Sequence, residues 1–370
     1  MAAVECWQKA AGWGLSERFS TGCARSPAQI LTGVVDFSAV SSPELARTSE
    51  RPTEVDLRVS VGTLHLKNPI IAASGTFGYG LEFAHLVDLN RLGGIVVKGL
   101  SIAPMEGAPP PRMCDTASGM VNAIGLQNVG VRAFVTEKLP KLLLYDTPII
   151  ANVFGKAVSE YVEVIRVLED TQGLAAYELN ISCPNTERGG IEYGTDPAAA
   201  EEVVRAARSA TKRPLWVKLS PVVGRIGLIA KACEEAGADA LVVANTYPAL
   251  CIDGHTRKSR LGSTGGGLSG AAIKPITMRL VYESSRAVKI PVVGLGGIEG
   301  PADAAEYIIA GASAVEVGTA HFIDPRASEN LVHALERWCM HEKVNRISDL
   351  RGSLQAEKAC GEVSRNGKIR

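Results

Sequence analysis

Apolar residues of this chain gather in short continuous runs separated by longer polar and helical stretches. The runs are rich in Val, Ile and Ala, and most precede a polar loop and then a helical pattern. They occupy residues 69–73, 94–98, 148–153, 177–181, 215–219, 240–244, 292–295 and 314–317. Continuous apolar runs are typical of strands buried on both faces, as in a parallel sheet. The pattern therefore predicts eight strand–helix units in succession.

Start and stop signals mark the helices between these runs. Asp196 before Pro197 is an N-cap followed by proline at the first helical position. Gly237 ends one helical pattern, while Pro301 opens another that Gly311 closes. Eight such units over about 260 residues predict a (β/α)8 TIM barrel. The alternative is an open doubly wound sheet, which rarely has eight such units in sequence.

Two connections are longer than a barrel requires. They follow the second and sixth strands, at roughly 99–147 and 246–274. Both leave the C-terminal ends of strands, which form the active face of such barrels. We therefore expect these long loops to be walls or lids of a site, with ornamental insertion as the alternative.

The two ends of the chain differ from the part between them. Residues 1–54 are rich in Ser, Thr and Ala without a sustained period, and we interpret them as a poorly ordered N-terminal extension. A transit peptide and a wrongly assigned start codon are alternatives, although the segment has many acidic residues for a transit peptide. We expect the barrel over 55–352 and a polar C-terminal tail over 353–370.

Composition narrows the functional classes. The 39 acidic and 39 basic side chains balance to a net charge of zero, which excludes a nucleic-acid binder driven by bulk charge. No apolar run approaches the roughly 18–20 residues needed to span a membrane, and the N-terminus lacks a signal-peptide pattern. The eight cysteines include no CxxC pair, so no metal or iron–sulfur centre is expected in this chain. These features predict a cytoplasmic protein with reduced thiols.

Glycines follow the last two predicted strands. Gly-Leu-Gly-Gly at 294–297 ends the seventh run, and Gly318 with Thr319 ends the eighth. Barrels commonly bind phosphate at this place through backbone N–H groups, which a Cβ atom would obstruct. The pair of loops favours a phosphorylated ligand, and simple tight turns are the alternative.

Two lysines end predicted strands. Lys98 closes the second run and Lys218 the fifth, so both side chains are expected at the mouth of the barrel. Their charges suit an anionic substrate, or the N1–C2=O region of a flavin, which becomes negative on reduction. A lysine snorkelling from a strand end is the alternative for either one alone.

Amide side chains and one thiol complete the candidate site. Asn residues end the third, fourth and sixth strands, and two more lie in the first long loop; these are Asn152, Asn180, Asn245, Asn122 and Asn128. Amides offer donors and acceptors, which match a planar ring with several C=O and N–H groups. Cys183 stands among them on a loop that Pro184 stiffens. A thiolate is a suitable general base where lysines and amide donors lower its pKa.

Six ordered motifs resemble dihydroorotate dehydrogenase. They are Ala-Ser-Gly-Thr-Phe-Gly at 73–78, Asn-Ala-Ile-Gly-Leu-Gln-Asn at 122–128, Asn-Ile-Ser-Cys-Pro-Asn at 180–185, Asn-Thr at 245–246, Gly-Leu-Ser-Gly at 267–270 and Val-Gly-Thr-Ala at 317–320. The similarity covers about residues 55–352. The motif at 122–128 and Ala-Asn-Val-Phe-Gly at 151–155 resemble class 1B, the catalytic subunit of the NAD-linked enzyme.

The resemblance implies oxidation of (S)-dihydroorotate to orotate in de novo pyrimidine (UMP) synthesis. Cys183 would remove the C5 proton, and the C6 hydride would pass to N5 of FMN. Lys98 would be a second catalytic residue. The implied substrate-binding residues are Lys98, Asn122, Ala123, Ile124, Gly125, Leu126, Asn180, Asn185, Asn245 and Thr246. The implied FMN-binding residues are Ser74, Lys98, Gly99, Asn152, Asn180, Lys218, Ala244, Gly270, Gly296, Gly297, Gly318 and Thr319.

Class 1B further implies partners. Electrons would leave FMN for a subunit carrying FAD and a [2Fe–2S] cluster, and then reach NAD⁺. A homodimer of this chain would lie within a heterotetramer, without nucleic acid or membrane. Cysteine at the base position resembles class 1, whereas the membrane-bound class usually has serine and an N-terminal hydrophobic helix.

Four other functions stay open at this point. Class 1A uses fumarate and no partner subunit, and a dihydropyrimidine dehydrogenase-type domain reduces uracil or thymine on the same barrel. A phosphate-binding isomerase or lyase without flavin, and a non-catalytic relative, are the others.

Overall fold

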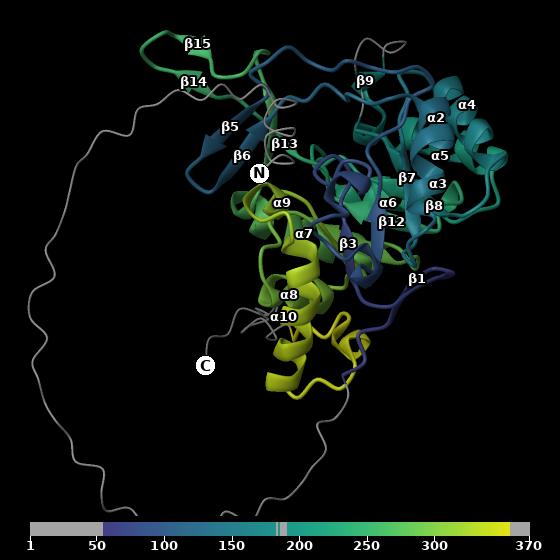
Figure 1. Cartoon of the computed structure of the whole chain (residues 1–370), viewed down its shortest axis with the longest axis vertical. Coiled ribbons are helices and arrows are strands. Elements are labelled where there is room, and N and C mark those ends of the chain that lie inside the picture. The colour runs from purple at the N-terminus through teal and green to yellow at the C-terminus, as the bar shows by residue number, and fades with distance from the viewer. Residues whose placement is uncertain (1–54, 183, 186–190, 356–370) are drawn as a thin grey trace, which may run out of the picture.

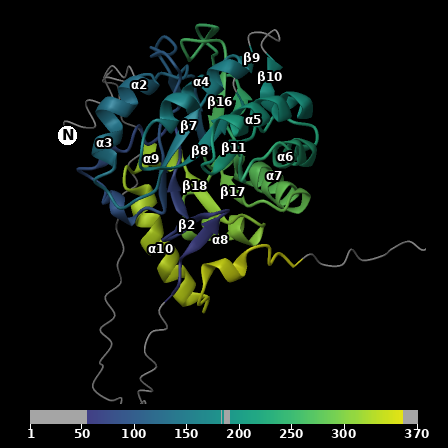
Figure 2. The same cartoon turned by 90° about the vertical axis from the view of Figure 1, so that its right-hand side faces the viewer.

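The computed structural model describes residues 55–182, 184–185 and 191–355, and Figures 1 and 2 show it from two sides. Eight parallel strands close into one barrel, which confirms the predicted (β/α)8 architecture and excludes the open sheet. In barrel order the strands are β3 (Ile70–Ala72), β4 (Gly94–Val96), β7 (Ile149–Val153), β8 (Leu174–Asn180), β11 (Leu215–Lys218), β12 (Ala240–Val243), β17 (Val292–Leu295) and β18 (Ala314–Val317). Seven of them lie within the predicted apolar runs, and β8 begins three residues before its run at 177–181.

Helices cover the outside of the barrel. They are α2 (Val131–Ala133), which continues through a π-turn at Phe134–Lys138 into α3 (Leu139–Leu142), α4 (Val158–Glu169), α5 (Pro197–Ala210), α6 (Ile226–Glu235), α7 (Lys274–Ala287), α8 (Pro301–Ile309), α9 (Ala320–Ile323) and α10 (Ala327–His341). The expected signals act as predicted at α5, where Asp196 accepts a hydrogen bond from the backbone N–H of Ala199. Gly237 and Gly311 have positive φ angles just after α6 and α8.

A hairpin of β1 (Val59–Val61) and β2 (Leu64–Leu66) precedes the first barrel strand. Its turn at Gly62 lies against Asp239, the residue before β12, so the hairpin covers the N-terminal ends of the strands. Val61 and Leu66 are buried there. The opposite, C-terminal end of the barrel carries the long connections.

The two long connections join into one additional sheet. Strands β5 (Met113–Thr116) and β6 (Gly119–Asn122) come from the first, and β13 (Tyr247–Ala249) and β16 (Gly266–Ser269) from the second. They pair antiparallel in the order β13-β16-β6-β5, with Gly267 opposite Asn122. A smaller hairpin, β14 (Ile252–Asp253) with β15 (Lys258–Ser259), projects beyond it (Figure 1). Residues of both connections line the cavity described below, as expected, but their pairing into one sheet was not predicted.

Candidate active site

A cavity of about 520 Å³ opens at the C-terminal end of the barrel. This volume lies in the range of small-molecule and cofactor sites. Its walls come from the ends of all eight barrel strands or the loops that follow them, and from the sheet that the two long connections form. Among the residues proposed from the sequence, those lining it are Ser74, Lys98, Gly99, Asn122, Ala123, Ile124, Gly125, Leu126, Asn152, Asn180, Lys218, Ala244, Asn245, Thr246, Gly270, Gly296, Gly297, Gly318 and Thr319.

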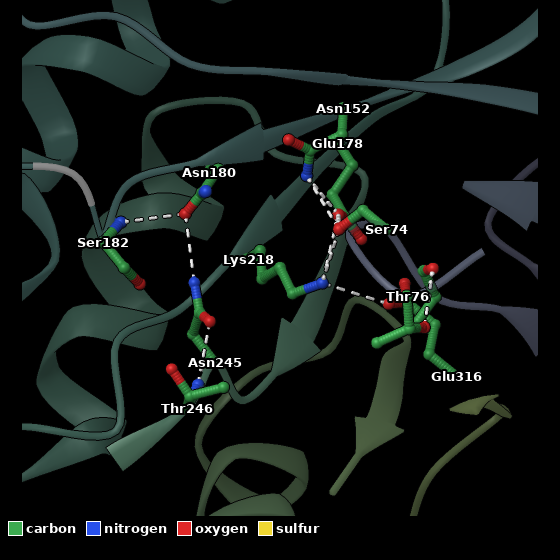
Figure 3. Close-up of polar contacts among 11 residues, drawn as sticks. Ser74, Thr76, Asn152, Glu178, Asn180, Ser182, Lys218, Asn245, Thr246 and Glu316 are labelled. Atoms are coloured by element: carbon green, nitrogen blue, oxygen red, sulfur yellow. Dashed lines mark hydrogen bonds and ion pairs between the residues drawn. The ribbon is translucent and has the colours of Figure 1, made fainter. Parts of the chain in front are cut away.

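Lys218 lies at the floor of this cavity within a network of polar side chains (Figure 3). Its Nζ is 3.3 Å from Glu178 Oε1, 3.2 Å from Glu316 Oε2 and 3.1 Å from Ser74 Oγ. Burial alone would lower the pKa of Lys218, but the two nearby carboxyl groups raise it above its ordinary value. Lys218 is therefore a fixed cation at the base of the site.

Glu178 and Glu316 were not among the residues proposed from the sequence. Both are fully buried in barrel strands, where β8 and β18 supply them. The sequence did contain a signal for them, because each is a single acidic residue within an apolar run. A carboxylate buried in this way requires a partner, which indicates a polar network inside the barrel. Their side chains face inward because residues two apart on a strand share a face, and Asn180 lies two residues after Glu178.

Amide side chains surround the cavity above this network. Asn245 Nδ2 donates to Asn180 Oδ1 over 3.2 Å, and Asn245 Oδ1 accepts from the backbone N–H of Thr246. Asn152 Nδ2 donates to Glu178 Oε1 over 2.5 Å, so its orientation is fixed by the buried carboxylate (Figure 3). Such pairing pre-organises donors and acceptors for a ligand with the complementary pattern.

Asn128 has a different place from the other amides. It is buried, and it holds the long connection together by accepting from the N–H of Gly130 and donating to Ser101 and to the carbonyl of Leu126. It is not one of the residues that line the cavity. Its inclusion in the ring of amides was wrong, because the side chain of an Asn in a turn can instead hydrogen-bond to the nearby backbone.

Lys98 follows β4 and lines the cavity. Burial lowers the pKa of its ammonium group below the ordinary value, while Glu82 opposes this shift. No ion pair engages its Nζ among the residues that the structure describes. An anionic ligand would supply the missing counter-charge.

The glycine loops after β17 and β18 form one corner of the cavity. Gly296 and Gly297 have positive φ angles, and a Cβ atom on Gly297 would lie 2.8 Å from the carbonyl oxygen of Gly270. Gly318 and Thr319 follow β18 and lead directly into α9. Backbone N–H groups can thus approach a ligand closely here, as phosphate binding requires.

His321 also lies near the cavity but is embedded. Its Nε2 is 2.8 Å from Ser328 Oγ and its Nδ1 is 3.4 Å from Thr76 Oγ1. Burial lowers its pKa to about 4, so the imidazole is neutral at physiological pH. We assign it a packing role beneath Thr76.

Cys183 lies outside the described residues. For Asn185 the structure gives the backbone, in a short pairing of Pro184–Asn185 with Ile191–Glu192, and its side chain lies outside what is described. Ser182, which precedes Cys183, lines the cavity. Further lining residues, to which no binding role was assigned from the sequence, are Ala73, Gly75, Thr76, Gln127, Gly267, Ser269, Ile273, Leu295 and Phe322.

Metal-binding clusters and membrane-spanning helices are both absent from residues 55–182, 184–185 and 191–355. No group of three or more His, Cys, Asp or Glu side chains there is arranged to hold a metal ion. No helix there combines the length and apolar character needed to cross a membrane.

The fold and the cavity together define a class of protein. It is a (β/α)8 barrel with a ligand site at its C-terminal mouth, built from cations, amides and glycine loops. Residues 56–338 match the model of the dihydroorotate dehydrogenase family. The chain belongs to this family, as its motifs predicted, and it is therefore an oxidoreductase.

Relatives agree on the family and differ in the named electron acceptor. A protein of Solibacter usitatus, provisionally named dihydroorotate dehydrogenase A (fumarate), is 56% identical over 81% of this chain and 98% of its own. Proteins of Pelobacter propionicus and Thermodesulfovibrio yellowstonii, 52% and 49% identical over 81% of this chain and 99% of theirs, are named catalytic subunits of dihydroorotate dehydrogenase B (NAD⁺). The structure of DHODH from Eimeria tenella in complex with ferulenol shares the fold, with a TM-score of 0.68 at 23% identity over 82% of this chain and 90% of that one.

Proposed function

We propose that this chain oxidises (S)-dihydroorotate to orotate in pyrimidine synthesis, with FMN bound at the mouth of the barrel. The observation that carries the proposal is the cavity itself. It collects two lysines, the amides of Asn152, Asn180 and Asn245, and glycine loops at one place, in a chain of the dihydroorotate dehydrogenase family.

The chemistry of the lining residues fits FMN. Lys218 offers a buried cation for the pyrimidine end of the ring, while the glycine loops offer N–H groups for the phosphate. The residues that would hold FMN are Ser74, Lys98, Gly99, Asn152, Asn180, Lys218, Ala244, Gly270, Gly296, Gly297, Gly318 and Thr319. Bound FMN supplies the acceptor for the hydride that leaves C6 of dihydroorotate.

The chain's own residues would bind the second ring and remove a proton from it. The residues assigned to dihydroorotate are Lys98, Asn122, Ala123, Ile124, Gly125, Leu126, Asn180, Asn185, Asn245 and Thr246, and Lys98 balances its carboxylate. Cys183, as thiolate, would take the C5 proton while the C5–C6 double bond forms. Loss of one proton and one hydride converts dihydroorotate to orotate, so atoms and electrons balance.

For the electron acceptor we propose NAD⁺, reached through a partner subunit with FAD and a [2Fe–2S] cluster. The names of the relatives from Pelobacter propionicus and Thermodesulfovibrio yellowstonii support this assignment. A homodimer within a cytoplasmic heterotetramer is the corresponding assembly. Fumarate is the second candidate acceptor, favoured by the name of the Solibacter usitatus relative.

We also propose a division of the chain into an extension at 1–54, the FMN-binding barrel at 55–352 and a polar tail at 353–370. The family model covers 56–338, which supports the placement of the barrel. The hairpin of β1 and β2 marks its start.

One experiment tests the reaction and the acceptor together. The full chain is purified alone and with co-expressed candidate partner subunits, and dihydroorotate oxidation is measured with NAD⁺, fumarate and a quinone. We expect FMN to copurify, and NAD⁺ reduction to require the partner. Turnover with fumarate by the chain alone would show that fumarate, and not NAD⁺, is the electron acceptor. Turnover of dihydrouracil instead of dihydroorotate would overturn the proposed substrate.

A further inference from the structure

Three charged side chains from different strands meet inside the barrel below the cavity. Glu178 lies on the fourth barrel strand and Glu316 on the eighth, at opposite sides of the closed sheet. Lys218, on the fifth strand, places one Nζ atom within hydrogen-bond distance of both (Figure 3). We call these three residues the buried triad.

The charges of the buried triad do not balance if both acids are ionised. One lysine then faces two carboxylates, and both Glu side chains are fully buried. An uncompensated charge in such surroundings costs several kcal/mol. A single proton on one carboxyl group would bring the net charge of the triad to zero.

The carboxyl oxygens of the triad also favour a held proton. Glu178 Oε2 and Glu316 Oε1 are buried, and neither accepts a hydrogen bond from a donor among the described residues. A buried carboxylate oxygen without a donor leaves negative charge unstabilised. A proton on one of the two carboxyl groups would remove that charge and give the group an O–H donor.

The two acids differ in the donors that they receive. Glu178 Oε1 accepts from Asn152 Nδ2, Ser74 Oγ and Lys218 Nζ, at 2.5, 3.3 and 3.3 Å. Among the described residues, only Lys218 donates to Glu316. Three donors stabilise the anionic form of Glu178, whereas Glu316 lacks such support. The proton therefore belongs on Glu316.

The pKa directions agree with this asymmetry. Burial, and then the negative charge of Glu178, raise the pKa of Glu316 well above its ordinary value. Burial also acts to raise the pKa of Glu178, but Lys218 and the hydrogen bonds hold it below its ordinary value. Two other titratable groups lie at this end of the barrel: His321, which is neutral, and Lys98, which lines the cavity.

We propose that Glu178 and Glu316 are positioning residues that share one proton, and that this proton sets the net charge of the buried triad beneath the cofactor. With Glu316 protonated the triad is neutral, and with Glu316 ionised it carries one negative charge. A negative charge beneath the flavin opposes its uptake of electrons. The shared proton thus keeps the reduction potential of FMN higher than two carboxylates would allow. This last step rests on the proposed function.

Infrared spectroscopy of the full chain tests the shared proton without substrate turnover. Near neutral pH exposed acids are ionised, so a C=O band of a protonated carboxyl group reports a buried acid. We expect this band in the wild type and its loss in Glu316→Gln. We also expect its loss in Glu178→Gln, because Glu316 would then ionise as the sole acid beside Lys218. Glu283→Gln, on the surface of α7, is the matched control and should keep the band.

Absence of the band from the wild type, or its survival in Glu316→Gln, would overturn the shared proton. Survival in Glu178→Gln would overturn the role of Glu178. Should a variant fail to fold, the wild-type band and its disappearance at alkaline pH still decide the question. None of these outcomes depends on whether the chain oxidises dihydroorotate.

The midpoint potential of bound FMN tests the consequence. In the wild type we expect an additional fall in potential at the alkaline pH where the infrared band disappears. Glu316→Gln should lack this fall and keep the wild-type potential near neutral pH, because its amide carries the same zero charge as the protonated acid. If the midpoint potential of FMN changed with pH in the same way in the wild type and in Glu316→Gln, the proposed effect of the shared proton on this potential would be overturned. If the midpoint potentials depended on pH as expected but the wild type did not oxidise dihydroorotate, the result would instead count against the proposed substrate.

Discussion

Asn122 and Gly267 face each other as register partners, although 145 residues separate them in the chain. Asn122 Nδ2 donates to the carbonyl oxygen of Gly267 over 3.2 Å. This contact joins the two long connections directly at the cavity wall. The proposed substrate residues in the segment 122–126 and at Thr246 are therefore held by one sheet rather than by two independent loops.

Substitution of Gly267 should damage substrate binding more than folding. A Cβ atom at this position would lie 2.0 Å from Thr246 Oγ1, so Gly267→Ala must displace the Thr246 side chain. We expect KM for dihydroorotate to rise about tenfold, corresponding to about 1.4 kcal/mol, with FMN content and Tm near the wild-type values. Steady-state kinetics and thermal melting measure this. Gly254→Ala, whose Cβ meets nothing within 4 Å, is the control. An unchanged KM would contradict the coupling.

Removal of the Lys218 charge should affect stability and FMN binding together. Lys218→Met leaves Glu178 and Glu316 buried without a cation, and breaking a buried ion pair from one side costs about 3–5 kcal/mol. We expect a lower free energy of unfolding in denaturant titration and a loss of copurifying FMN. Lys231→Met, on the exposed face of α6, should change neither quantity. Normal FMN content in a normally stable Lys218→Met protein would refute the assignment.

Local sequence patterns were sufficient to predict the barrel. Each strand is a continuous apolar run, and signals such as Asp196 and Gly311 act within a few residues of the elements they delimit. The sheet of the two long connections was not predictable in this way. Its strands are short and rich in glycine, and their register depends on partners more than a hundred residues away.

The candidate site shows the same limit. The lysines and asparagines of the site could be predicted because a polar residue directly at the end of an apolar strand is unusual. Asn128, like Asn122, is an asparagine in the first long connection, but its side chain hydrogen-bonds to Ser101 and Gly130 instead of facing the cavity. Only the structure reveals this difference. Glu178 and Glu316 were overlooked since an acid within an apolar run has meaning only once its partner across the barrel is known.

Acid should destabilise the protein through His321. Its pKa in the folded chain is about 4, below the ordinary value of 6.5, so the unfolded chain binds the proton more readily. Stability is unaffected above the ordinary pKa and falls as the pH drops toward the folded-state value. Between about pH 7 and about pH 5 this amounts to about 2 kcal/mol.

Denaturant titrations of His321→Gln at both pH values measure this contribution, because the variant has no imidazole to protonate. The wild type should lose about 2 kcal/mol more than the variant. His85→Gln, at an exposed position, should behave like the wild type. Equal losses in wild type and His321→Gln would show that His321 is not held neutral by the fold.

Deletion of residues 1–50 should leave dihydroorotate oxidation and Tm unchanged. The family model begins at residue 56, and the first described element, β1, begins at Val59. A longer deletion that removes the β1–β2 hairpin is the contrasting variant. It uncovers Val61 and Leu66, which are buried against the N-terminal ends of the barrel, and should lower Tm. A shorter protein that fails to fold would assign the extension a structural role.

Cys183→Ser should separate proton removal from cofactor binding. A serine hydroxyl is a far weaker base than a thiolate at neutral pH, and general-base catalysis contributes about 10²–10⁴-fold. We therefore expect the single-turnover reduction of FMN by dihydroorotate to slow by about this factor, while FMN content stays at the wild-type level because none of the proposed FMN contacts is removed. Stopped-flow absorbance measures the rate. Cys251→Ser is the control, because it makes the same sulfur-to-oxygen change at a residue that packs against Cys114 and Val121, away from the proposed chemistry, and it should react at the wild-type rate. A wild-type rate in Cys183→Ser would exclude the thiol as the base. The candidates would then be polar residues that line the cavity, of which Ser182 is the nearest to Cys183 in the chain.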